Sequence, residues 1–451
     1  MVIKFNTIIF FILSLLVCCC PKLYAQISLQ EAIQVTLDRN LQIKQAEFGK
    51  QISEQSLLEA KSALYPNLSV GVSNTHVYGL SFDQISGQLL RGNKWTSSAG
   101  AQVASSVTVF QGFQKINQIR ANKIQLLVDA SEIEKIKYDL ILSVVTNYVE
   151  AITNKDLYEA SLEQVKLSKE QLRQDSIQFD VGNKTLADLA QAENQVATDE
   201  LNVMTSDNAY ELSMLALKQL MEMRPDTIIE LIKPDVDALM AEYVAMPFED
   251  VYRKSLAVQP DIEQAGYNKQ LASKNIDIAK GSYYPTLSVS ASYGTNYSSE
   301  GKDIITQQKM SFSDQLDQNK SFRGGVSLDF PIFNNNRTKV AVSKAKISYL
   351  QAENNEALLK RNLEKTISQA LLDLKSANKQ YLASQIAFNT SKVAFLAFKD
   401  RYDAGVANSI ELFTSQTNMN RAEFDMIRRK YELVFRSKVI DYYIGNPITL
   451  N

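Results

Sequence analysis

The sequence predicts an internally duplicated α+β membrane protein, built from long α-helical coiled-coil hairpins and four β-strands per protomer. Three observations support this fold class. Similar segments occur twice in the same order, two long stretches contain neither proline nor glycine, and four short segments alternate apolar with small or polar residues. The charge is nearly balanced, with 48 basic and 50 acidic residues, which argues against nucleic acid as a partner.

Residues 1–25 have the features of a secretory signal peptide. Lys4 precedes a short apolar run, and the segment ends at Ala25, after which we expect cleavage. An uncleaved anchor is one alternative, and a lipid anchor on one of Cys18–Cys20 is another. The chain has no other cysteine, so the mature protein lacks thiols for a disulfide or a metal site. No later apolar run is long enough for a spanning helix, so any membrane crossing must be made by strands.

One structural unit occurs twice in the chain. The segment "ALYPNLSVGVS" at 63–73 aligns with "SYYPTLSVSAS" at 282–292, an offset of 219 residues, whereas "VFQG" at 109–112 aligns with "IFNN" at 332–335, an offset of 223. The difference of four residues falls between two strand segments, where we expect a loop. We therefore divide the chain into a signal peptide (1–25), a first repeat (26–221), an inter-repeat linker (222–247), a second repeat (248–445) and a short tail (446–451).

Each repeat begins with a helix followed by two strands. In the first repeat, Ser28 and Glu31 form a capping box that starts a helix over 28–64, and Tyr65-Pro66 prevents its continuation. Alternation of apolar with small or polar residues predicts the four strands, at 68–73, 101–109, 287–293 and 325–330.

The faces of these strands differ in character, one apolar and the other small or polar. The pattern suits a half-buried sheet in a soluble protein, and equally a barrel with lipid outside and water inside. Aromatic residues occur in the predicted loops between the strands, 74–98 and 294–322. In a membrane barrel these would form interfacial girdles: Tyr78, Trp95, Tyr297 and Phe322.

Two very long helices follow the strands. Residues 115–181 and 338–404 contain no proline or glycine, so each can form one helix of 67 residues, roughly 100 Å long. Apolar residues recur in them every seven positions, which predicts supercoiling against neighbouring helices. They are Val144, Ala151, Tyr158, Val165, Leu172 and Phe179, then Ile367, Leu374, Tyr381, Phe388, Phe395 and Tyr402.

A glycine ends each of these helices. Gly182 and Gly405 reverse the chain, and residues 185–221 and 408–440 return as the second arm of each hairpin. The two glycines therefore mark the tips of two coiled-coil hairpins.

The mature chain resembles the TolC family of bacterial outer-membrane efflux proteins over essentially its whole length. The resemblance is carried by "SLQEAIQVTLDRN", the pair "LYPNLSV" and "YYPTLSV", the pair "VFQG" and "PIFNNN", and the pair "FDVGNKTLADLAQAENQ" and "YDAGVANSIELFTSQTN". No single motif is diagnostic, but their order, duplication and constant offsets together are specific.

The resemblance implies a homotrimer, in which four strands per protomer contribute to a trimeric 12-stranded β-barrel that continues as a helical tunnel through the periplasm. Residues 222–247 would belong to an equatorial belt around the tunnel. The implication agrees with the physics, because a four-stranded sheet has two edges and cannot stand alone in lipid, whereas three copies can close.

The implied function is a passive exit duct in the outer membrane, serving tripartite efflux or type I secretion. A periplasmic adaptor (membrane fusion protein) and an inner-membrane pump would open it at the helix tips. The resemblance implies no cofactor. A periplasmic coiled-coil scaffold or adaptor without a pore is the alternative, although it has no need of the four strands. An enzyme is a third class, but the mature chain has one histidine, His76, and no catalytic or metal-binding motif.

The resemblance also assigns a gate to the hairpin tips. In the family, carboxylates six and nine residues after the second glycine ring the constriction. Glu411 matches the first position and Thr414 occupies the second, so one acidic ring is absent. Asp188 and Tyr402 occupy positions that a hydrogen bond links in the family's closed state. Ala407 stands where a basic residue often forms another link, so we expect a weaker or different closure.

Helix capping accounts for the same carboxylates without any gate. Thr185-x-x-Asp188 and Asn408-x-x-Glu411 read as capping boxes, and a carboxylate in a first turn is stabilised by the helix dipole by roughly 0.3 to 1 kcal/mol. The two roles are compatible, because threefold symmetry turns a cap residue into a ring of charge. Glu411 would then favour cations at the mouth.

Overall fold

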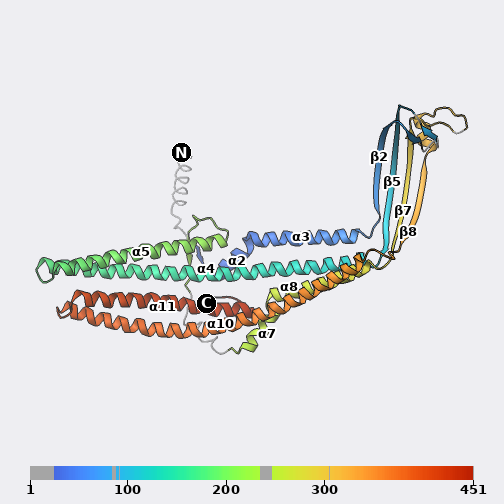
Figure 1. Cartoon of the computed structure of the whole chain (residues 1–451). Coiled ribbons are helices and arrows are strands. Elements are labelled where there is room, and N and C mark those ends of the chain that lie inside the picture. The colour runs from blue at the N-terminus through green and yellow to red at the C-terminus, as the bar shows by residue number, and fades with distance from the viewer. Residues whose placement is uncertain (1–24, 84–87, 91, 234–245, 304, 450–451) are drawn as a thin grey trace, which may run out of the picture. The chain divides into compact units, whose positions relative to one another are not determined.

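The computed structural model describes residues 25–83, 88–90, 92–233, 246–303 and 305–449 (Figure 1). The predicted signal peptide up to residue 24, including Cys18–Cys20, and residues 234–245 of the predicted linker lie outside the described residues. The chain divides into two compact units, which we treat separately. One is made of residues up to 46 with 132–262 and 359–451, and the other of 47–131 with 263–358. Among the described helices, none is both long and apolar enough to cross a lipid bilayer.

Two helical hairpins dominate the first unit. Their outgoing arms are α4 (Gln114–Asp180) and α10 (Arg337–Asp403), each of 67 residues, and their returning arms are α5 (Leu186–Leu220) and α11 (Ser409–Ile444). The predicted long helices are thus confirmed to within one residue. At the tips, Gly182 and Gly405 have φ angles of 80° and 75°, the left-handed conformation that glycine adopts without steric cost.

The seven-residue pattern predicts the buried seam better in α10 than in α4. In α10 all of the predicted apolar positions are buried except Phe388, which is half-buried. In α4 only Val144 and Ala151 are buried, and the remaining four predicted positions are half-buried. Toward the tip of α4 the fully buried side chains are instead polar: Ser161, Gln164, Ser168, Gln171 and Asp175.

The main apolar core of the first unit surrounds Tyr148 on α4, whose side chain is fully buried. Next to it, β1 (Ala25–Ile27) pairs in parallel with β6 (Ile229–Leu231), which lies in the predicted linker. The Tyr148 hydroxyl lies 2.8 Å from the carbonyl oxygen of Ile27 and 2.9 Å from that of Ile232, and it accepts the Ile232 N–H at 3.1 Å. One tyrosine therefore connects the start of the described chain and the linker to α4.

The helix predicted over 28–64 is two helices in the structure. The capping box of Ser28 and Glu31 starts α2 (Leu29–Arg39) as expected, but the helix stops at Asn40, before α3 (Leu41–Ser62). Asn40 has an extended backbone, and its side-chain oxygen accepts the Gln42 N–H at 2.8 Å. This local bond offers the backbone an alternative to the helix.

The second repeat contains the same interruption. There α7 (Phe248–Val258) and α8 (Pro260–Gly281) are separated by Gln259, which also has an extended backbone. Pro260 opens α8, at the first helical position where its missing N–H removes no helical hydrogen bond.

The second unit contains a four-stranded antiparallel sheet in the order β2-β5-β7-β8. The strands are β2 (Asn67–Tyr78), β5 (Trp95–Gln111), β7 (Thr286–Ser298) and β8 (Ser321–Asp329). Within the described part of the chain, β2 and β8 each have one unpaired edge.

The strands are longer than alternation predicts, because the backbone ladder continues through polar residues such as Asn74 and His76. The aromatic residues assigned to loops consequently lie on strands. Tyr78 is paired with Trp95 across β2 and β5, with ring centroids 5.3 Å apart, and Tyr297 and Phe322 lie on β7 and β8. The connections contain a short hairpin of β3 (Ser81–Asp83) with β4 (Gln88–Leu90), and a short helix, α9 (Phe312–Gln318).

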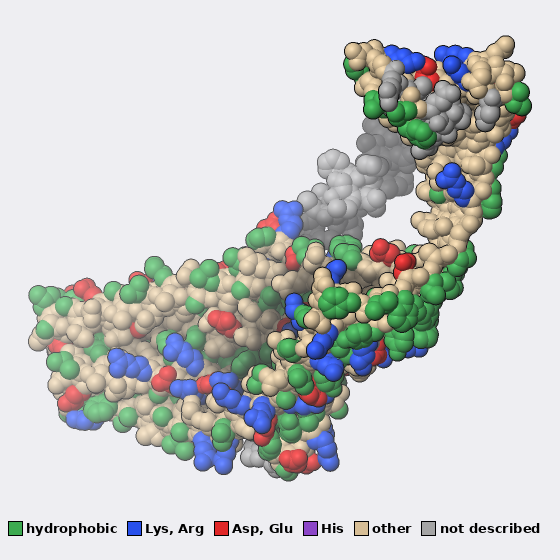
Figure 2. All heavy atoms as spheres, turned by 45° about the vertical axis from the view of Figure 1, so that its right-hand side comes forward, with side chains coloured by type: hydrophobic (Ala, Val, Ile, Leu, Met, Phe, Trp, Pro, Cys, Tyr) green, Lys and Arg blue, Asp and Glu red, His purple; other side chains and the backbone are tan. Residues whose placement is uncertain are grey.

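The two faces of the sheet differ as predicted. Rows of paired residues such as Val70, Val103 and Tyr293 form one face, and rows such as Ser69, Ala104 and Ser292 form the other. In Figure 2 charged side chains are spread over the helical hairpins, whereas the sheet between its loops and the helices carries few of them.

The turn from β5 into α4 depends on a glycine. Gly112 has a φ of 56°, and a Cβ atom on it would lie 2.1 Å from the carbonyl oxygen of Gly281. In the second repeat Asn335 and Asn336, also with positive φ, occupy the corresponding turn before α10.

Tyr148→Phe tests the attachment of the linker. The change removes the hydroxyl that bonds the backbone of Ile27 and Ile232, whose own N–H···O=C bond of 3.3 Å remains, so we expect a loss of about 0.5 to 1.5 kcal/mol in the free energy of unfolding. Thermal and urea unfolding of the purified protein measure it. Tyr284→Phe is the control, because Tyr284 is 54% exposed. Equal midpoints for Tyr148→Phe and the wild type would contradict the assigned role.

Candidate functional site

The hairpin tips bring together most of the residues that the sequence singled out. Asp188 lies in the first turn of α5, where Thr185 and Asp188 form a complete capping box. The Asp188 carboxylate accepts the Thr185 N–H at 3.0 Å and the Thr185 hydroxyl at 2.7 Å. The hydroxyl of Thr185 first, and then that of Ser409 at the second tip, hold the pKa of Asp188 below its ordinary value. This carboxylate is fully engaged within one protomer.

Glu411 occupies the equivalent place in α11 but is used differently. Its backbone N–H donates to Asn408 Oδ1 at 2.8 Å, so Asn408 caps the helix, but the reciprocal bond from the Glu411 carboxylate is missing. The sequence reading of Asn408-x-x-Glu411 as a complete capping box is therefore wrong in its second half. The Glu411 side chain is exposed and makes no hydrogen bond or ion pair with any described residue.

Tyr402 connects the two hairpins. Its side chain is 2% exposed, and its hydroxyl donates to Asp175 Oδ1 at 3.0 Å, from α10 to α4. Lys184, in the first tip, places its Nζ atom 3.2 Å from the centroid of the Tyr402 ring, within the range of a cation–π interaction. We call Tyr402, Asp175 and Lys184 the tip clasp.

This arrangement differs from the link that the resemblance implies. The hydroxyl of Tyr402 bonds Asp175, not Asp188, whose Oδ2 atom accepts from the cap residue Thr185. Burial raises the pKa of the Tyr402 hydroxyl, and the nearby charge of Asp175 adds to the effect. Tyr402 therefore remains a protonated donor at every physiological pH.

Asp175 is a carboxylate enclosed in the helical bundle, with 1% of its surface exposed. Its Oδ1 atom also accepts from Gln171 Nε2 at 3.2 Å, whereas Oδ2 has no hydrogen-bond partner among the described residues. Burial raises the pKa of Asp175, while the hydrogen bonds of Tyr402 and Gln171 and the charge of Lys184 act in the opposite direction. A buried carboxylate is stable only with such partners, which is why losing one of them is costly.

The two positions that depart from the family pattern lie beside the tip clasp. Thr414 is exposed on α11, where a second acidic ring would stand. Ala407 is half-buried against an apolar cluster of Phe395, Tyr402, Leu412 and Met419. A basic side chain is thus replaced by a small apolar one that packs against the base of Tyr402.

Sequence reasoning missed two of the three members of the tip clasp. Asp175 lies between the apolar heptad positions Leu172 and Phe179, and Lys184 lies in a polar turn. A signal for Asp175 was available, because it continues a polar series at three- and four-residue spacing with Ser168 and Gln171.

The groups at the tips are suited to holding the two hairpins together. The groups there are hydrogen-bond donors, acceptors and charges on helix ends, and in the described ranges no three histidine, cysteine or acidic side chains are grouped to hold a metal ion. The contacts of the tip clasp join one hairpin to the other, so separating the tips requires breaking them.

Comparisons with known proteins agree with one another. The family model described as outer membrane efflux protein matches residues 32–221 and 251–446, one match for each repeat. Outer membrane efflux protein BepC of Brucella suis is 20% identical over 412 residues, covering 91% of this chain and 83% of BepC. Outer membrane protein TolC of Escherichia coli is 21% identical over 433 residues, covering 94% of this chain and 83% of TolC.

Solved structures show the same fold. The crystal structure of the CmeC outer membrane channel of Campylobacter jejuni superimposes with a TM-score of 0.77, at 18% sequence identity, over 94% of this chain and 86% of CmeC.

Proposed function

Because this chain belongs to the outer membrane efflux protein family, we propose that three copies form the passive exit duct of a tripartite efflux or type I secretion system. The chain is an efflux protein of the outer membrane. The proposal adds the homotrimer, its 12-stranded barrel, the periplasmic tunnel, and opening at the tips by an adaptor and an inner-membrane pump.

The observation that carries the proposal is the sheet. Its edge strands β2 and β8 leave backbone donors and acceptors unpaired, and one of its faces carries apolar rows such as Val70, Val103, Tyr293 and Phe322. Unpaired backbone groups cost several kcal/mol each in lipid. Joining β8 of one copy to β2 of the next removes every edge, and the apolar face then meets lipid while the polar face surrounds water. A periplasmic scaffold has no use for such a sheet.

The hairpins support a closed resting state. Threefold assembly would bring six tips together, and in each protomer the tip clasp holds α10 against α4. An adaptor that binds the tips would open the duct by separating Tyr402 from Asp175 and Lys184. Glu411, which has no partner among the described residues, would face its copies at the mouth.

Purification in detergent and reconstitution in planar lipid bilayers test the proposal. We expect a trimer that resists dissociation in sodium dodecyl sulfate until heated, and discrete channels of low resting conductance. A monomer that forms no channels and stays in the soluble periplasmic fraction would support the scaffold instead.

Tyr402→Phe and Lys184→Met test the tip clasp. The first removes the hydroxyl donor and the second the cation, while each keeps an apolar side chain of similar size. We expect the open fraction in bilayers to rise about tenfold, equivalent to about 1.4 kcal/mol, because Tyr402→Phe loses a hydrogen bond to a charged group and Lys184→Met loses a cation–π contact. Arg401→Met is the control, because Arg401 lies over Phe398 and not over Tyr402. Wild-type resting conductance in both variants would show that closure lies elsewhere.

Glu411→Gln tests the ring of charge at the mouth. Removing three carboxylates should lower the preference for potassium over chloride and weaken block by divalent cations, since acidic rings favour cations. Reversal potentials in a salt gradient measure the first effect. Asp400→Asn, an exposed acidic residue of α10 near the same tip, is the matched control. If Glu411→Gln leaves selectivity and block unchanged, the ring assignment is incorrect.

A further inference from the structure

The four strands of the sheet carry very little charge. Within β2, β5, β7 and β8, only Arg323 and Asp329 are charged, and both lie on β8. Asp329 ends the strand, and the two residues are six positions apart, or roughly 20 Å along an extended chain. Arg323 is therefore the one positively charged side chain on these four strands, and it lies on the edge strand β8.

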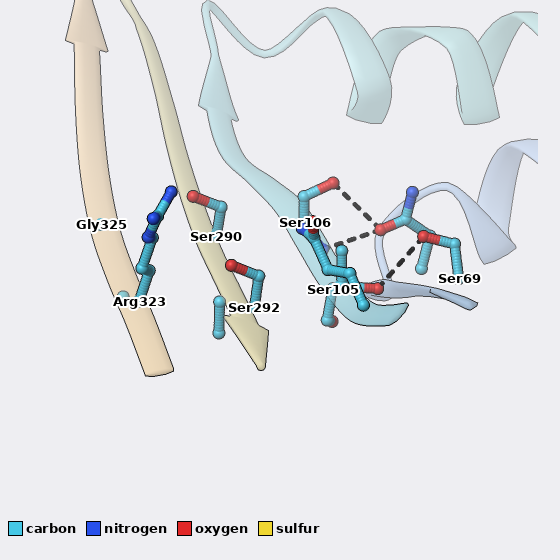
Figure 3. A pocket seen from close by; sticks show the side chains of 12 residues that line it. Ser69, Ser105, Ser106, Ser290, Ser292, Arg323 and Gly325 are labelled. Atoms are coloured by element: carbon cyan, nitrogen blue, oxygen red, sulfur yellow. Dashed lines mark hydrogen bonds between the residues drawn. The ribbon is translucent and has the colours of Figure 1, made fainter. Parts of the chain in front are cut away.

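The strand register places Arg323 on the polar face. It is paired with Ser292, which is paired with Ala104, which is in turn paired with Ser69. Paired residues in an antiparallel sheet point to the same side. In the proposed barrel this side is the inner wall, because the opposite side carries the apolar rows. Figure 3 shows Arg323 and the hydroxyls of Ser290 and Ser292 together on this face.

These groups line a concave pocket of about 420 Å³. Gly325, two residues after Arg323 on the same face, has no side chain and so leaves room beside the guanidinium group. Among the described residues, Arg323 makes no hydrogen bond or ion pair, and neither do the hydroxyls of Ser290 and Ser292. By contrast, the hydroxyls of Ser69 and Ser106 are used within the sheet, bonding Ala104 and Asn67. The donors around Arg323 are thus available to a ligand.

We propose that Arg323, with Ser290 and Ser292, forms an oxyanion-binding site on the inner wall of the barrel. The guanidinium group is always protonated and offers a planar fork of N–H donors that matches carboxylate, phosphate or sulfate, and the two hydroxyls supply further donors. The inference rests on the proposed trimer, which places three such sites around the lumen. Anionic solutes would then be favoured in the barrel, in contrast to the acidic mouth that Glu411 would form.

Reversal potentials in planar bilayers test this, using tenfold gradients of potassium chloride and of potassium phosphate. For Arg323→Gln we expect the permeability ratio of potassium to anion to rise about twofold in both salts, since charged residues lining a lumen tune selectivity. Arg323→Lys should retain the chloride value but shift the phosphate value, because an ammonium group lacks the bidentate fork. Ser290→Ala with Ser292→Ala should shift the phosphate value alone.

Lys320→Gln is the location control. Lys320 immediately precedes β8 and is paired with Asp317, so we expect a smaller shift than for Arg323→Gln. An equal shift in the permeability ratio would show that total charge, and not the position of Arg323, sets the selectivity, which would overturn the proposed site. Normal channels of unchanged selectivity in Arg323→Gln would also overturn it. If the wild type forms no channels at all, the proposed duct fails and not this site alone.

Discussion

Backbone hydrogen bonding in lipid is the constraint on which the rest of this structure depends. A strand that enters hydrocarbon must pair all of its N–H and C=O groups, and a sheet of four strands cannot do so by itself. The described sheet of this chain has two edge strands, β2 and β8, each with one unpaired side. The proposed trimer pairs these edges, and its symmetry would multiply every exposed charge by three, so that single residues such as Glu411 and Arg323 would become rings.

Duplication supplies two hairpins to each protomer, but the two copies have diverged. In the first tip the carboxylate of Asp188 takes part in the cap of α5. In the second tip Asn408 caps α11, and the Glu411 carboxylate has no partner among the described residues. Similarly, α10 presents an apolar seam and α4 a polar one near the tip. The first copy thus provides Asp175 and Lys184 of the tip clasp. The second copy provides Tyr402 and the Glu411 carboxylate.

Features that depend on strong local rules were predictable from sequence. The ends of α4 and α10 follow from the absence of proline and glycine between Gly112 and Gly182, and from the same absence in the second repeat. Ser28 with Glu31 predicted the start of α2 correctly. The break at Asn40 was missed because one side-chain bond outweighed a continuous helical pattern. The outer ends of the strands were missed because residues such as Asn74 do not alternate in polarity.

The tip clasp was harder to foresee, because its members are 227 residues apart where Tyr402 meets Asp175. Position matching to a family linked Tyr402 with Asp188, whereas in this structure the hydroxyl of Tyr402 bonds Asp175. The local sequence predicted the bond between Thr185 and Asp188, but only the packing of α4 against α10 brings Asp175 within reach of Tyr402. How two helices far apart in the sequence align with each other depends on tertiary packing, which local sequence patterns do not describe.

The polar seam of α4 has a thermodynamic consequence. Separating helices joined by leucine or valine exposes apolar surface to water, at roughly 25 cal/mol for each Å². Ser161, Gln164, Ser168 and Gln171 exchange their protein contacts for water with little net loss when they are wetted. In the proposed opening, the α4 side of the tip therefore tolerates hydration, whereas the second hairpin keeps an apolar cluster of Phe395, Tyr402, Leu412 and Met419 there. The apolar core around Tyr148 holds the distant part of α4.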